Sequence, residues 1–117
     1  MAPRISRGDI WTAAGGSGYV GKPRPVVILQ DDRFEHTASV TICPLTTNPA
    51  EVPLVRPVVT PDESNGLRVP CRLMADKITT IPKSGLGARI GRLAPSVMAE
   101  LDRAVLVFLG FSGKESR

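Results

Sequence analysis

The sequence predicts a mainly β (α+β) fold in which about seven short, mostly antiparallel strands precede one C-terminal helix. Short runs of β-branched and aliphatic residues alternate with turn residues through most of the chain. Only the last part has apolar residues at helical spacing. With 117 residues, 42% hydrophobic and 22% charged, the chain suits one folded domain with one core. We therefore expect a single domain over residues 1–117, with its core over residues 7–110.

The first two predicted strands, residues 7–14 and 25–30, are joined by a glycine-rich connection. Residues 15–22, "GGSGYVGK", contain four glycines in eight positions, which favours a loop longer than a tight turn. The second strand, "PVVILQ", has no polar alternation. Such a run is typical of a strand covered on both faces, so we expect it at the centre of the sheet.

The later strands are shorter or carry proline. Prolines cannot donate to a strand ladder, so Pro53 and Pro57 place the strand that contains them at an edge. The predicted strands are residues 38–47, ending in the threonine pair Thr46 and Thr47; residues 52–60, the edge strand; residues 67–76 and 77–82, a bent strand pair around Asp76; and residues 88–93.

The helix is predicted from Pro95, which suits a first helical turn, to Gly110, a usual C-terminal cap. Its final turns, "AVLVFLGF", are apolar all round, so this end either is enveloped by the sheet or meets another chain. Closing the sheet into a small barrel would remove its edges, although periodicity does not choose between a barrel and an open sheet. The spacing that predicts the helix is that of Val97, Leu101, Ala104, Val105 and Phe108.

Charge and composition narrow the function classes. The net charge is +4 and arginine outnumbers lysine eleven to four, a bias that suits bidentate contacts to phosphate or carboxylate. The spacing of Cys43 and Cys71 does not fit a zinc site. No run is long enough to span a membrane, and the N-terminus lacks the apolar region of a secretory signal. We therefore expect a cytoplasmic protein.

Several segments in this order carry a resemblance to a known family: "RGDIW", "KPRPVVIL", "ICPLTT", "DESNGLRVPCRLMADKITTI" and "GRLAPSVMAELDRAVLVFLG". Together, over Arg7 to Gly110, they resemble the MazF/PemK family of bacterial toxin endoribonucleases. The resemblance implies an SH3-like barrel with a C-terminal helix, a homodimer, and cleavage of single-stranded RNA, usually messenger RNA, without metal or cofactor. It also implies a cognate MazE-like antitoxin with an acidic, initially disordered tail.

The resemblance implies a catalytic pair at Arg24, which opens the second strand, and Thr46, which closes the third. Proline stands on both sides of Arg24, so its backbone is stiff and extended. A guanidinium offers paired N–H groups to phosphate oxygens, and a threonine hydroxyl adds a donor. Attack by the ribose 2′-OH on phosphorus would leave a 2′,3′-cyclic phosphate and a 5′-OH.

Proton transfer is less clearly assigned. Asp76 is a weaker acid candidate, and a turn carboxylate paired with Lys77 or Arg72 is an equal alternative. Relatives carry an acidic residue or histidine before the Arg-Pro motif, where this chain has Tyr19. We expect His36, in a polar turn, to be a solvated loop residue. The candidate RNA-binding residues are Tyr19, Lys22, Thr47, Arg68, Arg72 and Lys77.

Two other functions fit the same fold. A CcdB-like toxin binds DNA gyrase and does not need the Arg24 and Thr46 pair. A non-catalytic SH3-like module would hold nucleic acid or a peptide. Since one barrel hosts many functions, fold alone does not separate these three.

Overall fold

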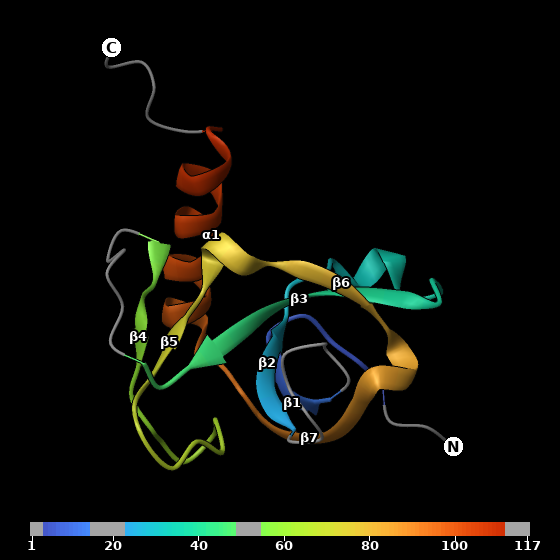
Figure 1. Ribbon diagram of the computed structural model, residues 1–117, viewed down its shortest axis with the longest axis horizontal. Helices are drawn as coiled ribbons and strands as arrows, with labels where there is room; N and C mark the ends of the chain where they lie inside the picture. The colour runs from blue at the N-terminus through green and yellow to red at the C-terminus, as the bar shows by residue number, and fades with distance from the viewer. Residues whose placement is uncertain (1–3, 15–22, 49–54, 112–117) are drawn as a thin grey trace.

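The computed structural model describes residues 4–14, 23–48 and 55–111, which form a curled antiparallel sheet with one helix beside it (Figure 1). The strand order is β4-β5-β3-β2-β1-β7, and β6 pairs with β3. The strands are β1 (Asp9–Ala13), β2 (Arg24–Ile28), β3 (Ser39–Thr46), β4 (Val58–Val59), β5 (Cys71–Leu73), β6 (Thr79–Pro82) and β7 (Leu86–Arg92); the helix is α1 (Pro95–Leu109), and short 3-10 turns are η1 (Asp32–Phe34), η3 (Ala75–Lys77) and η4 (Lys83–Gly85).

Strand β3 organises the sheet because it pairs with three other strands. One edge pairs with β2, and the other pairs first with β6 and then with β5. The change of partner falls between Ile42, the last residue paired with β6, and Leu45, the first paired with β5. Pro44 lies in this gap, where a missing N–H costs no ladder bond on that edge. Its carbonyl accepts a hydrogen bond from Met74 N at 2.9 Å.

The sheet buries apolar side chains on both faces. Inside the curl lies a cluster of buried residues that includes Trp11, Val26 and Ile42. The opposite face packs Val27 and Cys43 against α1 and the β4–β5 hairpin. Because Val26 and Val27 are neighbours that point to opposite faces, β2 is covered on both sides, as its unbroken apolar run predicts.

The predicted fold class is confirmed: the described part of the chain has seven strands and then one helix, and the sheet forms a half-barrel. The helix ends as expected at Gly110, which has the left-handed φ of 82°. The predicted edge strand does lie at the edge, but of residues 55–60 only Val58 and Val59 are strand, and residues 49–54 lie outside the described part. Pro57 precedes the short ladder and cannot donate to it.

The expected strand pair around Asp76 is wrong in one respect. Strands β5 and β6 do not pair with each other; both pair with β3, on either side of its change of partner. Turn η3, which contains Asp76, carries the chain from one to the other. Pro44 falls at the break between the two ladders, and it has no N–H to donate to a partner strand there.

The C-terminal turns of α1 extend beyond the sheet (Figure 1). Leu106, Val107, Phe108 and Leu109 are each between 43% and 49% exposed, so the sheet does not envelop this end. Among the described residues, no helix has the length and apolarity needed to cross a membrane.

A tight turn over residues 62–66 fixes the connection between β4 and β5 against β7. The buried amide of Asn65 accepts from Asp62 N and Leu67 N, and donates to Thr60 O. Gly66 follows with a φ of 72°, and a Cβ there would lie 2.1 Å from the Ile90 carbonyl oxygen. Only glycine therefore fits this approach of two backbones.

We predict that Gly66→Ala destabilises the protein far more than Gly110→Ala. Both glycines have positive φ, and the left-handed backbone alone costs alanine about 1 kcal/mol. Gly110 has open space around it, whereas Gly66 abuts backbone, so we expect a loss on the order of 3 kcal/mol at position 66. Urea unfolding followed by circular dichroism measures both, and equal losses would contradict the prediction.

Candidate functional site

Arg24 is the first residue of β2 and is exposed. It pairs across β1 with Ala13, and Pro23 and Pro25 restrict the backbone on each side. Alternation along β2 puts Arg24 on the same face as Val26. The position of Arg24 at the start of β2 and the face on which its side chain lies thus both follow from the local sequence.

Thr46 ends β3 next to that position. The β2–β3 ladder pairs Val26 with Pro44, and Arg24 and Thr46 are each two residues further along. Continuing the antiparallel register puts them opposite each other, on the same face. The body of the sheet therefore does not separate these two predicted residues.

The same face continues from Thr46 onto the β4–β5 hairpin. Thr46 pairs with Arg72 of β5, and Arg72 pairs with Val58 of β4. Since paired residues project to one side, Arg24, Thr46 and Arg72 form a row across three neighbouring strands. Two guanidinium-bearing residues thus flank one threonine.

A hollow of about 190 Å³ lies at this row. Its lining residues are Thr46, Thr47, Val58, Pro70, Cys71 and Arg72. Thr46 Oγ1 accepts a hydrogen bond from Asn48 N at 3.1 Å, which orients the side chain and leaves its hydroxyl proton available to a ligand. A larger hollow, about 380 Å³, lies by the start of α1, but none of the predicted site residues lines it.

Asp76 has a partner that the sequence analysis did not anticipate. Arg56 donates to both carboxylate oxygens, from Nε at 2.9 Å and from Nη2 at 2.8 Å. The two side chains are only 14% and 17% exposed. The hydrogen bonds from Arg56 are the main cause that lowers the pKa of Asp76 below its ordinary value of 3.8. The carboxylate is therefore charged at neutral pH and held in a fork.

Arg72, one of the two partners expected for Asp76, instead contacts the backbone of Arg56. Its Nη1 donates to the Arg56 carbonyl at 3.3 Å. Lys77, the other expected partner, is exposed at the end of η3 and adds only charge attraction to the Asp76 carboxylate. Arg56 lies 20 residues from Asp76 in sequence, and no spacing rule links positions that far apart.

The remaining predicted RNA-binding residues fall into two groups. Thr47 is exposed and lines the hollow, while Arg68 is exposed in the bend that leads to β5 and does not line it. Tyr19 and Lys22 lie outside the described residues.

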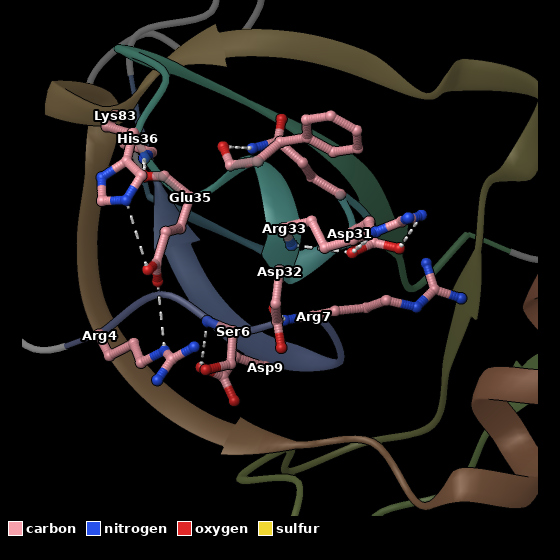
Figure 2. A network of polar contacts seen from close by, with 12 residues as sticks. Arg4, Ser6, Arg7, Asp9, Asp31, Asp32, Arg33, Glu35, His36 and Lys83 are labelled. Atoms are coloured by element: carbon pink, nitrogen blue, oxygen red, sulfur yellow. Dashed lines mark hydrogen bonds and ion pairs between the residues drawn. The ribbon is translucent and has the colours of Figure 1, made fainter.

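His36 lies in a separate polar network around η1 (Figure 2). It is 92% exposed and lies 3.8 Å from Glu35, which also pairs with Arg4 and accepts a hydrogen bond from Lys83 through its carbonyl. Figure 2 shows these side chains gathered between the N-terminal segment and η1. None of them lines the hollow beside Thr46, so His36 is a surface residue, as its polar turn predicts.

The cysteines do not supply a nucleophile. Burial raises the pKa of Cys71, which lines the hollow, and raises that of Cys43 to about 12. Both are therefore thiols at neutral pH, and the thiolate is the reactive form. Across residues 4–14, 23–48 and 55–111, no group of three or more His, Cys, Asp or Glu side chains is placed to hold a metal ion.

Comparison with solved structures identifies the fold. The Mycobacterium tuberculosis toxin MazF-mt6 superposes with a TM-score of 0.76 at 30% identity, covering 89% of this chain and 98% of that one. A structure described as an endoribonuclease in complex with its cognate antitoxin, from a mycobacterial species, gives a TM-score of 0.73 at 29% identity, with 95% and 98% coverage.

Sequence comparison gives the family. A probable endoribonuclease MazF from Mycolicibacterium smegmatis is 54% identical over 109 residues, covering 93% of this chain and 100% of the relative. Endoribonuclease MazF9 from M. tuberculosis is 33% identical over 115 residues, with 90% and 96% coverage. The model of the PemK-like, MazF-like toxins of type II toxin-antitoxin systems matches residues 6–109, and the chain belongs to that family.

Proposed function

We propose that this toxin is an endoribonuclease that cuts single-stranded RNA, with messenger RNA as its cellular target, without metal or cofactor. The observation that carries the proposal is the row of Arg24, Thr46 and Arg72 along one face, beside a hollow. This row offers guanidinium and hydroxyl donors to one phosphate, and relatives that match nearly the whole chain are named endoribonucleases.

The chemistry is an internal transfer at phosphorus. The 2′-oxygen bonds to the phosphorus and loses its proton, while the bond to the 5′-oxygen breaks and that oxygen gains a proton. The products are a 2′,3′-cyclic phosphate and a 5′-OH. Negative charge grows on the non-bridging oxygens, and the Arg24 guanidinium with the Thr46 hydroxyl meets it with preplaced donors.

The roles of the neighbouring residues follow from their positions. Thr47, beside the hollow, contacts the phosphate next to the cut, and Arg72, in the same lining, adds a second guanidinium to the row. Arg68 and Lys77, both exposed, extend the positive track, and Tyr19 and Lys22 belong to the same interface. Asp76 is not assigned a proton-transfer role, because Arg56 occupies both of its oxygens.

The partners of the toxin are a second copy of the chain and a cognate MazE-like antitoxin. A solved structure of similar fold is described as a complex with its antitoxin. An acidic, flexible antitoxin tail would compete with RNA for the same basic row. The site of action is the cytoplasm, where messenger RNA is translated.

Incubating the purified protein with RNA in EDTA separates this proposal from the two alternatives. Fragments with cyclic phosphate and 5′-OH ends support the nuclease, and sequencing those ends gives the cleavage motif. Intact RNA with inhibited gyrase would support the CcdB-like function, and intact RNA that is merely retained would support a binding module.

We predict that Arg24→Ala and Thr46→Ala each lower the cleavage rate at least about 100-fold, because each removes a donor to the developing charge. Thermal unfolding should change little, since Arg24 is exposed and Thr46 is only half-buried. Single-turnover cleavage of a mapped RNA measures the rates. His36→Ala is the control and should cut at the wild-type rate; full activity in either of the first two variants would refute that residue's role.

We also predict a homodimer at micromolar concentration. The C-terminal end of α1 exposes several neighbouring apolar side chains, which include Leu106 and Phe108. Contact with a second copy of the chain would remove these side chains from water. Sedimentation velocity should give a dimer for the wild type, and Phe108→Ser should shift it toward monomer if this end lies in the interface. A wild-type protein that stays monomeric would contradict the prediction.

A further inference from the structure

We infer that the Arg56–Asp76 ion pair is a positioning unit that aims Arg72 at the scissile phosphate. The inference rests on the proposed ribonuclease function and adds two residues that do not touch RNA themselves. It also gives Arg72 a defined part in the reaction, as the second guanidinium beside Thr46.

The ion pair joins the segment before β4 to the turn after β5, and both of these strands contribute residues to the lining of the hollow. Asp76 belongs to η3, which follows β5, and Arg56 belongs to the segment that leads into β4. The fork geometry, with contacts of 2.9 and 2.8 Å, fixes both the distance and the plane of the two groups. Both side chains are shielded from water, so the contact is stronger than a surface pair.

The pair reaches Arg72 through the backbone of Arg56. Arg72 Nη1 donates to the Arg56 carbonyl at 3.3 Å, and the next carbonyl, that of Pro57, accepts from Leu73 N at 2.9 Å. Val55, which directly precedes Arg56, is buried and holds the backbone on the N-terminal side of Arg56 in the core. Movement of Arg56 would therefore move the oxygen that holds Arg72.

Arg72 needs such a support because its strand is short. Strand β5 has three residues, and only Leu73 and Arg72 pair with β3. The guanidinium has five N–H donors, so one bond to a carbonyl leaves others for a phosphate in the hollow that Arg72 lines. Displacing a catalytic group by about 1 Å can cost roughly 100-fold in rate.

The test compares Asp76→Asn, Arg56→Gln and the double variant on an RNA oligonucleotide that carries the mapped cleavage site. Each single variant should lower kcat about 10- to 100-fold and leave KM within about twofold, since alignment is lost rather than RNA affinity. The double variant should be no slower than the slower single variant, because both changes break one unit.

A second readout reports on Arg72 directly. In the wild type, replacing one non-bridging oxygen of the scissile phosphate by sulfur should slow one diastereomer more than the other, because guanidinium contacts are stereospecific. This preference should fall to the same value in Asp76→Asn, Arg56→Gln and Arg72→Ala. A loss of stability alone would not change the preference of the folded molecules.

The matched control is Asp102→Asn, which removes another Arg–Asp ion pair away from the hollow, one in which Arg7 Nη2 donates to both oxygens of Asp102. It should lower the unfolding temperature but keep the wild-type kcat and diastereomer preference. If Asp76→Asn does not fold, Arg56→Lys, which keeps the charge and loses the fork, replaces it.

Three outcomes would overturn the inference alone. Wild-type kcat and preference in both single variants would do so, and so would equal effects in Asp102→Asn. Complete inactivity of Asp76→Asn with full activity of Arg56→Gln would make Asp76 a direct proton carrier instead. A wild-type protein that cuts no RNA would instead overturn the proposed function.

Discussion

The register between β2 and β3 is the constraint on which the site depends. It pairs Val26 with Pro44 and so brings the ends of the two strands, Arg24 and Thr46, to one edge of one face. A slip by one residue would send one of the two side chains to the opposite face. Burial on both faces of β2 makes such a slip costly, because each shifted side chain would leave its own apolar cluster. The hydrophobic core therefore determines the alignment of the polar site.

The chain uses the tetrapeptide Arg-Pro-Val-Val twice, at residues 24–27 and 56–59, with different results. In both copies the proline stiffens the backbone and the valines enter a strand. Arg24 opens an interior strand and is exposed, whereas Arg56 pairs with Asp76 and is largely shielded from water. The difference comes from what the fold puts opposite each copy, which local sequence does not specify.

This contrast explains which features of the fold and of the site could be predicted from the sequence. The helix from Pro95 to Gly110 and the order of strands followed from spacing and turn residues, which act locally. The Arg24 and Thr46 positions came from the family resemblance, and their adjacency follows from one strand register. The Arg56–Asp76 pair was not predicted, because its two residues lie 20 positions apart and only the pairing of β4 with β5 brings their segments together. The division of the β3 edge between β5 and β6 was missed because the effect of Pro44 depends on which strands flank it.

The change of partner along β3 also leaves the two parts of the sheet joined by ladders of different length. The half-barrel is joined by long ladders, such as the four pairs between β3 and β6, whereas the β4–β5 hairpin is attached to β3 through two. Fewer ladder bonds mean a lower free energy of local opening, so the hairpin should exchange its amide hydrogens sooner than the half-barrel. The row of Arg24, Thr46 and Arg72 crosses this boundary, with one guanidinium on the half-barrel and the other on the β4–β5 hairpin. A ligand that bridges the row would thus tie the hairpin to the half-barrel and slow the local opening of the hairpin.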